Sequence, residues 1–390
     1  MRIAMVFDGL GMGGIERVGI QYVALLTQAG HEVDVYNLQP EKSELQDEFE
    51  GVADAVYPGF LPLSCVPGQY MLMVKRWWWW GKYAYPLAYL VSKLCMLALR
   101  VVQPKRRYDV AIAFSGHMRD LTFVAHGFVR AEKRMAWVHG AILEYLVLSP
   151  TFADLYRKIC NLCVLSTDRQ EFVFSSHPYL SDDLSVHQLY NPIDLSARPP
   201  HADAVAALRR SHGGYILVVG RLDRDKDPAT VIRARKILGE RYGKTPHVVL
   251  VGDGSLRAEL EAFTQSLEID DSVFFVGLRH DVEDFYASAQ LFVHSSPSEG
   301  LPTVLLEAMK YGVPIVATDS PPGVSEILGS DRYGLRCRVG DAEDMAAKIA
   351  TMLDDASLRE RYRESGFDRV RDFSCDTISI KLNQILKNLR

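Results

Sequence analysis

Apolar strand-like runs alternate with amphipathic helical segments along almost all of the 390 residues, and this alternation limits the possible folds most strongly. Residues 2–7 are a continuous apolar run, 9–14 a glycine turn and 15–28 an amphipathic segment. Strands separated by helices pair in parallel, and a parallel sheet needs helices on both faces. The pattern therefore predicts an α/β fold.

The alternation is interrupted once, between residues 186 and 200, where Asn191-Pro-Ile-Asp194 and Pro199-Pro200 are typical of a connection between domains. The chain length also suits two domains of about 150–200 residues each. We expect a domain over 1–195, a second over 200–372, and a C-terminal helix over 373–390 that packs back on the first. Two doubly wound, Rossmann-like domains would face each other across a cleft, with ligands at the carboxyl ends of the strands.

Charge and cysteine content exclude several classes of protein. The net charge of −5 argues against nucleic acid as a partner. Residues 1–8 lack the apolar core and cleavage site of a signal peptide, and six irregularly spaced cysteines fit a reduced, cytoplasmic chain. Cys160 and Cys163 have a redox or half-zinc spacing, but no second pair follows, which favours buried structural thiols.

The glycine turn Gly9-Leu-Gly-Met-Gly-Gly14 matches the dinucleotide fingerprint in its place between a strand and a helix. Asp34 follows 20 residues later, but it lies inside a strand instead of ending one, where a ribose-binding acid belongs. Three interpretations stay open: a phosphate or carbohydrate contact through backbone N–H groups, a dinucleotide site, and a structural turn.

In the C-terminal half, Gly220-Arg-Leu-Asp-Arg-Asp-Lys226 follows the first strand. Arg221 could chelate a diphosphate and Lys226 could add a point charge. Interleaved acids leave open the alternative of a solvated charged turn. The next strands end in loops containing Gly252, then Gly277 and Arg279, where glycine lets the backbone approach a ligand.

A fourth loop, residues 295–302, enters a helix whose free N–H groups near Thr303 and Val304 could hold phosphate. Glu299 lies in this loop, and Glu307 lies one turn inside the helix, within the apolar run 304–309. An unpaired carboxylate in such a run is costly, so Glu307 favours function over a solvated face. The two carboxylates could hold opposite ends of one ligand.

These motifs together resemble glycosyltransferase family 4, the retaining glycosyltransferases with the GT-B fold. The resemblance covers nearly the whole chain and rests on Gly-Gly-Ile-Glu-Arg at 13–17, Trp137-Val-His139-Gly, Asn191-Pro-Ile-Asp194, Gly220-Arg-x₄-Lys226, Val-Gly-Asp-Gly at 251–254, and the pair Glu299 and Glu307.

The resemblance implies a role for each matching residue. Arg221 and Lys226 would neutralise the leaving diphosphate. Glu307 would bind the ribose, and Glu299 would bind donor-sugar hydroxyls, assisted by the N–H groups of Gly300 and Leu301. Gly13 and Gly14 would face the diphosphate or the acceptor, His139 would contact the donor sugar, and the base, expected to be uracil, would lie near Gly277 and Arg279. The acceptor would attack from the side of the leaving group, and neither a metal nor another cofactor would be required.

A basic aromatic segment over about 69–107 is the chain's own feature, since no acid lies between Asp54 and Asp109 while eight basic residues do. Its densest part comprises Lys75, Arg76, Trp77, Trp78, Trp79, Trp80 and Lys82. This composition is typical of an in-plane contact with an anionic membrane surface. It predicts a peripheral protein on the inner face of the cell membrane, with a lipid-linked or glycan acceptor in surface polysaccharide or glycolipid assembly. The alternative is an ordinary domain helix preceded by a loop lid.

Other functions remain. A dinucleotide-dependent oxidoreductase explains the turn Gly9–Gly14 but none of the C-terminal motifs. An epimerase or phosphorylase of the same fold, or a non-catalytic relative, would share the architecture. Loss of Arg221, Lys226 or Glu299 would indicate a non-catalytic relative, and all three are present.

Overall fold

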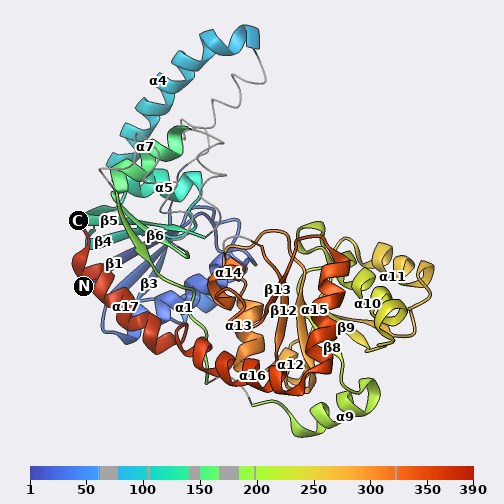
Figure 1. Ribbon diagram of the computed structural model, residues 1–390. Helices are drawn as coiled ribbons and strands as arrows, with labels where there is room; N and C mark the ends of the chain where they lie inside the picture. The colour runs from blue at the N-terminus through green and yellow to red at the C-terminus, as the bar shows by residue number, and fades with distance from the viewer. Residues whose placement is uncertain are drawn as a thin grey trace. The chain divides into compact units, whose positions relative to one another are not determined.

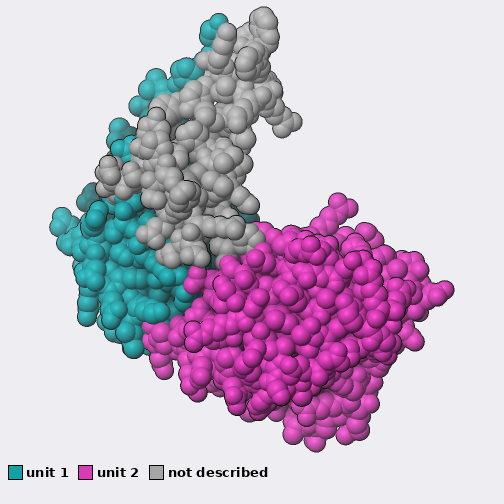
Figure 2. Space-filling model, in the orientation of Figure 1, with its two compact units in different colours: residues 1–192, 378–390 teal, residues 193–377 magenta. Residues whose placement is uncertain are grey.

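The computed structural model describes residues 1–59, 61, 78–102, 106–139, 150–166, 184–196, 199–320 and 323–390. The chain divides into two compact units, and Figure 2 colours them separately. Unit 1 comprises Met1–Pro192 and Ile378–Arg390, and unit 2 comprises Ile193–Thr377.

Unit 1 is built on a seven-stranded parallel sheet in the order β3-β2-β1-β4-β5-β6-β7 (Figure 1). Residues Ile3 to Phe7 of β1, an interior strand of this sheet, are completely buried, as expected for a parallel strand covered on both faces. The elements in chain order are β1 Arg2–Phe7, α1 Gly14–Gln28, β2 Glu32–Asn37, α2 Gln46–Glu50, β3 Ala55–Pro58, α4 Trp78–Val102, β4 Arg107–Ala113, α5 Met118–Ala125, β5 Arg130–Val138, α7 Pro150–Ile159, β6 Asn161–Val164 and β7 Ser185–Gln188.

The last helix of the chain, α17 (Cys375–Asn388), ends against the sheet of unit 1. The Lys133 ammonium donates to the Leu389 carbonyl at 2.6 Å, and the backbone N–H of Arg390 donates to the Asn161 side chain at 3.0 Å. His31 and Asn383 are also hydrogen-bonded, at 2.6 Å. These polar contacts fix the end of the chain on unit 1.

Unit 2 has a six-stranded parallel sheet in the order β10-β9-β8-β11-β12-β13, the strand order of a dinucleotide-binding fold. Pro228 opens α10, where its missing N–H costs nothing, and Gly243 closes it at φ +61°. The elements are α9 Ala202–His212, β8 Ile216–Val219, the 3₁₀ turn η3 Arg224–Lys226, α10 Pro228–Tyr242, β9 Val248–Val251, α11 Arg257–Ser266, β10 Val273–Gly277, α12 Val282–Ser288, β11 Leu291–His294, α13 Thr303–Lys310, β12 Ile315–Thr318, α14 Gly323–Leu328, β13 Leu335–Cys337, α15 Ala342–Asp354 and α16 Ala356–Arg371.

The prediction of an α/β chain with two doubly wound parallel sheets is confirmed. The sequence pattern was wrong at the sheet edges. Residues 186–188, assigned to a connection, belong to strand β7, which pairs with β6. All four residues of β7 are partly exposed, so the strand lacks the apolar run by which buried strands are recognised. The thiol of Cys163 in β6 is buried, and burial raises its pKa.

Candidate functional site

The loops after β8, β9 and β10 lie against one another at the carboxyl-end rim of the unit 2 sheet. The Gly220 N–H donates to the Val251 carbonyl at 3.0 Å, and the Gly252 N–H donates to the Gly277 carbonyl at 2.9 Å. Gly252 has φ +137°, and a Cβ there would overlap the Gly220 carbonyl, so this approach requires glycine. The structure thus brings together the glycine loops predicted to surround a ligand.

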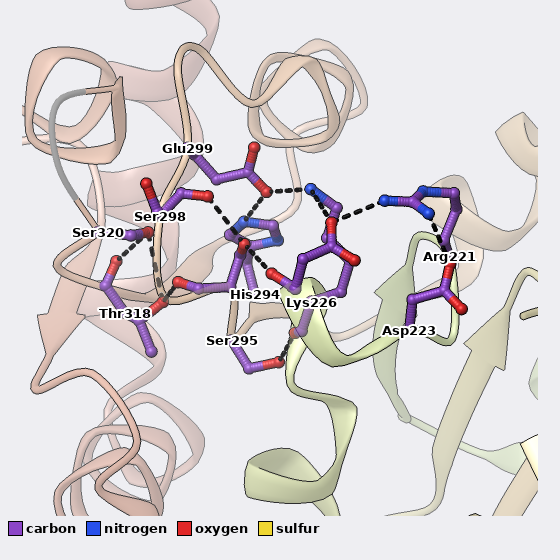
Figure 3. Close-up of polar contacts among 11 residues, drawn as sticks. Arg221, Asp223, Lys226, His294, Ser295, Ser298, Glu299, Thr318 and Ser320 are labelled. Atoms are coloured by element: carbon purple, nitrogen blue, oxygen red, sulfur yellow. Dashed lines mark hydrogen bonds and ion pairs between the residues drawn. The ribbon is translucent and has the colours of Figure 1, made fainter. Parts of the chain in front are cut away.

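Lys226 and Glu299 form an ion pair in this rim, with 2.7 Å between Nζ and Oε1 (Figure 3). His294, at the end of β11, places Nε2 3.3 Å from the same oxygen. Both contacts use Oε1, and Figure 3 shows the other carboxylate oxygen directed away from Lys226 and His294. Oε2 therefore remains available to a ligand.

Two buried serines fix the backbone that carries Lys226. The Ser295 hydroxyl donates to the Lys226 carbonyl and the Ser296 hydroxyl donates to the Asp225 carbonyl, each at 2.8 Å. Since these serines follow directly after β11, the η3 turn is tied to the loop that holds Glu299. The cation and the carboxylate are therefore positioned by neighbouring, hydrogen-bonded loops before any ligand binds.

Burial alone would raise the pKa of Glu299, but the neighbouring His294 and Lys226 outweigh it and lower the pKa to about 2. The carboxyl is therefore ionised at neutral pH and acts as an acceptor. His294 was not predicted as a site residue, because a histidine at the end of an apolar run is not distinguishable from a core residue by sequence pattern.

We expect Glu299→Gln to lower the free energy of unfolding by at most about 3 kcal/mol near neutral pH. The Glu299 pKa is lower in the folded state, so its stabilisation is complete above about pH 4.5 and is lost as the pH falls towards 2. Urea unfolding of both proteins between about pH 7 and pH 3 should show the difference shrinking in acid. Glu240→Gln, at an exposed pair with Lys236, is the control, and a pH-independent difference for Glu299→Gln would contradict the assignment.

Arg221 is paired within its own turn. Its guanidinium donates to Asp223 at 2.5 Å and to Asp225 at 2.7 Å. The Asp225 carboxylate also lies 3.5 Å from the Lys226 ammonium, so it joins the two cations. The interleaved acids are thus internal counter-ions of the predicted diphosphate turn, and a bound diphosphate would have to compete with them.

Glu307 is partly buried, and its partner is the phenol of Tyr286, which donates to Oε2 at 2.9 Å. Burial raises the pKa of Glu307, and the hydrogen bond from Tyr286 opposes this effect. The Tyr286 ring stacks on Tyr311 at 5.8 Å between centroids. The expectation that this carboxylate needs a partner is met by a tyrosine from α12 that the sequence did not indicate.

The loop between Glu299 and α13 is closely packed against the start of α14. The Gly323 N–H donates to the Glu299 carbonyl at 3.0 Å, and a Cβ on Gly323 would overlap the Gly300 carbonyl. Leu301 is buried. Thr303 and Val304 lie in the first turn of α13, and the side chain of the N-cap residue Pro302 makes no capping hydrogen bond to this turn. Gly323 was missed because its role is a backbone contact between segments distant in sequence.

Arg279 also has a partner in its own loop. Its guanidinium donates to both oxygens of Asp281, at 2.8 and 2.6 Å, and it lies over the Phe285 ring. The residue stands after β10 as expected, but its charge is already balanced by a neighbour.

In unit 1, the ends of β1, β4 and β5 carry a second group of polar residues. The His139 ring donates from Nε2 to the Phe114 carbonyl at 2.7 Å, and burial lowers its pKa to about 4. The imidazole is therefore neutral at pH 7 and fixed in one tautomer. Gly13 and Gly14 lie at the start of α1, as predicted.

The sequence did not identify Asp8 and His117 at this rim. His117 Nδ1 lies 3.5 Å from Asp8 Oδ2, and the hydrogen bond to Asp8 raises the pKa of His117. Gln39 donates to the same Asp8 oxygen at 2.9 Å. Their position in the loops after β1, β4 and β2 was the available signal, since ligands bind at such strand ends.

Asp34 lies in the middle of β2, where Tyr108 donates to its carboxylate at 2.7 Å and Arg106 donates at 3.2 Å. It is buried there and does not end the strand. This position argues against a ribose-binding acid and so against the dinucleotide alternative.

Four of the seven residues predicted for membrane contact lie in the described part of the chain. Lys75, Arg76 and Trp77 lie outside the described residues, whereas Trp78, Trp79, Trp80 and Lys82 fall in the first turns of α4. Within the described parts of the chain, no helix is both long and apolar enough to span a bilayer.

Comparison with known proteins identifies the chain's relatives. Residues 205–369 match the family model of glycosyl transferases, group 1. A Campylobacter jejuni N-acetylgalactosaminyltransferase named for an N-acetylgalactosamine–N,N'-diacetylbacillosaminyl–diphospho-undecaprenol substrate is 33% identical over 47% of this chain and 49% of its own. The lipopolysaccharide core glycosyltransferase LpsE of Rhizobium meliloti is 33% identical over 44% and 49%. The chain spans about half the length of these curated relatives.

The fold has known counterparts over its full length. The HepE protein of Anabaena, solved in complex with UDP, superposes with a TM-score of 0.73 at 20% identity, covering all of both chains. This similarity identifies the two Rossmann-like units as those of the GT-B fold.

Proposed function

We propose that the chain is a retaining glycosyltransferase that takes its sugar from a nucleotide-diphosphate sugar, with UDP as the nucleotide; the match of residues 205–369 to the family model of group 1 glycosyl transferases supports the transferase class. The observation that carries the proposal is the Lys226–Glu299 pair, held at the rim of unit 2 beside the first turn of α13. The UDP complex of the structural neighbour supports the choice of nucleotide.

In the proposed donor site, the cations bind the diphosphate and the carboxylates bind hydroxyl groups. Lys226 and Arg221 neutralise the diphosphate, Glu299 accepts hydrogen bonds from sugar hydroxyls through Oε2, and Glu307 accepts them from the ribose. Gly252 and Gly277 let the backbone approach the donor, and the backbone N–H groups of Gly300 and Leu301 donate to the sugar. On unit 1, neutral His139 offers Nδ1 as an acceptor for a sugar hydroxyl, because Nε2 already donates to Phe114.

Cleavage of the glycosidic bond leaves negative charge on the diphosphate and positive character on the sugar. Fixed cations aimed at the diphosphate stabilise this transition state. We propose that the acceptor attacks from the leaving-group side, with retention, and that no metal is required. The two cations Arg221 and Lys226 support this, since they stand in one turn and can neutralise the diphosphate themselves.

We propose that the acceptor is lipid-linked or a glycan, in surface polysaccharide or glycolipid assembly, and that the protein works peripherally on the inner face of the cell membrane. The name of the Campylobacter relative, which contains diphospho-undecaprenol, supports this acceptor class. Helix α4 supports the membrane contact, because its 25 residues contain no acid and begin with three tryptophans.

Two other functions are less well supported. The buried position of Asp34 removes the residue on which an oxidoreductase assignment would depend. An epimerase or phosphorylase of the same fold could share the donor site, and the nature of the reaction product distinguishes them.

Thermal shift across a nucleotide panel tests the proposal. We expect UDP and UDP-sugars to raise the melting temperature, and NADH and NADPH to leave it unchanged, because ligands stabilise the state that binds them. Stabilisation by nicotinamide cofactors and not by any nucleoside diphosphate would overturn it. With a stabilising UDP-sugar, release of UDP together with a new glycoside separates transfer from epimerisation.

A further inference from the structure

Four arginines surround a pocket of about 380 Å³ in unit 1, at the amino-end edge of β4 and β5. This edge is opposite to the one at which the sheet ends in Gly13, His117 and His139. Arg100 comes from the last turn of α4, Arg107 from the start of β4, and Arg130 and Arg134 from β5. We call this group the arginine pocket. Asp109 and Glu132 are the acids of its lining, so positive charge predominates.

Among the described residues, none forms an ion pair with these arginines. Within the same parts of the chain, the buried Nε of Arg134 has no hydrogen-bond partner. One terminal nitrogen of Arg100 and one of Arg134 lie 3.3 and 3.5 Å from the point that a Cβ on Gly127 would occupy. Asp109 is partly engaged, because the Arg2 N–H donates to its carboxylate at 2.7 Å.

The positive field reaches His126, which caps the end of α5. Burial lowers its pKa first, and the cations Lys158, Lys93, Arg100 and Arg134 lower it further, to about 4. The imidazole is therefore neutral at pH 7. Like charges that converge without counter-ions in a pocket favour an anion, and planar guanidinium groups match the oxygen geometry of phosphate.

Helix α4 leads from solvent to this pocket with an apolar stripe on one face. Tyr83, Leu87, Leu90, Leu94 and Leu97 are 55–72% exposed. Their spacing of four, three, four and three residues places them on one side of the helix, and Arg100 follows three residues after Leu97. Figure 1 shows α4 reaching well beyond the sheet of its own unit, and Met96 on its inner side packs into the unit 1 core.

We propose that the arginine pocket binds the phosphate group of an anionic membrane lipid while the apolar stripe of α4 lies against the acyl chains. The inference rests on the proposed membrane location. It adds a specific phosphate site to the membrane contact, at the opposite end of α4 from the tryptophans. The apolar stripe favours a lipid over a free phosphate, because a soluble anion would not bury the exposed apolar side chains. A second copy of the chain fits less well, because α4 carries Lys82, Lys93 and Arg100 and no acid, so pairing would bring like charges together.

Vesicle sedimentation of the full-length protein tests the pocket. Arg130→Gln/Arg134→Gln should weaken partition onto phosphatidylcholine vesicles containing phosphatidylglycerol by about tenfold or more, since each basic residue near such a surface contributes about 1 kcal/mol. Arg209→Gln/Arg210→Gln, on α9 of unit 2, removes the same charge and should partition like the wild type. Leu87→Gln/Leu94→Gln should also weaken partition. Equal partition of the wild type and Arg130→Gln/Arg134→Gln would overturn the proposal.

Two further measurements identify the occupant, and a third separates this site from the proposed function. Stabilisation by inorganic phosphate that Arg130→Gln/Arg134→Gln abolishes, together with wild-type vesicle binding by that variant, would show a soluble-anion site and overturn the lipid assignment. A concentration-dependent dimer that Leu87→Gln/Leu94→Gln disrupts, without loss of vesicle binding, would overturn the role of the stripe. UDP should stabilise Arg130→Gln/Arg134→Gln as much as it stabilises the wild type. If UDP did not stabilise the wild type, the proposed function would be rejected, whereas the vesicle-binding result would still hold.

Replacing Trp78–Trp80 with serine separates this site from the aromatic contact. The serine variant should lose partition onto neutral and anionic vesicles alike, whereas Arg130→Gln/Arg134→Gln should lose its preference for anionic lipid. If the arginine variant kept that preference, the phosphate site would be rejected even with the aromatic contact intact.

Discussion

Replacing Lys226 with alanine is expected to lower kcat/KM for sugar transfer by about 10²–10³-fold, the effect of removing one preorganised group that stabilises transition-state charge. The ammonium is fixed by Glu299 at 2.7 Å and by Asp225 at 3.5 Å, so it needs little reorganisation when the diphosphate leaves. Because negative charge grows as the bond breaks, more of the loss should fall on kcat than on UDP affinity. Steady-state kinetics and UDP titration together measure this division.

The control for Lys226→Ala is Lys236→Ala, which removes a lysine from an exposed pair with Glu240 on α10 and should leave kcat/KM unchanged. A second control addresses folding, since Lys226→Ala leaves the Glu299 carboxylate with His294 as its neighbour. Lys226→Arg keeps the charge but not the shape and should recover only part of the rate. If Lys226→Ala retained most of its kcat/KM, the diphosphate role would be rejected.

The sequence was a good guide to the C-terminal unit because its buried strands are continuous apolar runs. Strands β9 and β11 are wholly buried, and the turns that follow them contain the glycines and polar residues that mark the rim. The edge strands β3, β7 and β13 were missed, since they have only three or four residues and most of these are partly exposed. A strand this short and this exposed lacks the apolar pattern on which recognition depends.

The candidate site could be predicted as a set of residues but not as a set of contacts. The sequence indicated Arg221, Lys226, Glu299 and Glu307, while the structure shows that Arg221 is already paired and that His294 shares the Glu299 carboxylate. Tyr286 reaches Glu307 from a helix 21 residues earlier. The contact between Tyr286 and Glu307 depends on how the two helices are placed in the folded chain, and a local sequence pattern does not specify this placement. In unit 1, Asp34 was correctly separated from the glycine turn because its place inside a strand is a local property.

Binding of UDP is expected to weaken by about 10–100-fold in Glu307→Ala, which removes a charged acceptor for the ribose hydroxyls. The carboxylate is oriented by the Tyr286 phenol at 2.9 Å, and that phenol is held by stacking on Tyr311. If Glu307 binds the ribose, its replacement should change the preference for the ribose hydroxyls as well as the affinity for UDP. The wild type should prefer UDP to its 2′-deoxy or 3′-deoxy analogue, and Glu307→Ala should lose that preference, because the hydroxyl then has no carboxylate to bind.

Tyr286→Phe separates this contact from a structural effect. Removing the phenol hydroxyl leaves the Glu307 carboxylate in place without its orienting donor, so discrimination between UDP and the deoxy analogue should be reduced but still measurable. Calorimetric titration of both nucleotides into the wild type, Glu307→Ala and Tyr286→Phe gives the coupling between the side chain and the ribose hydroxyl as a double difference. If Glu307→Ala weakened UDP and the deoxy analogues equally, the carboxylate would act by supporting α13 rather than by binding ribose. A coupling in the wild type that only Glu307→Ala removes completely would place the ribose on this side chain.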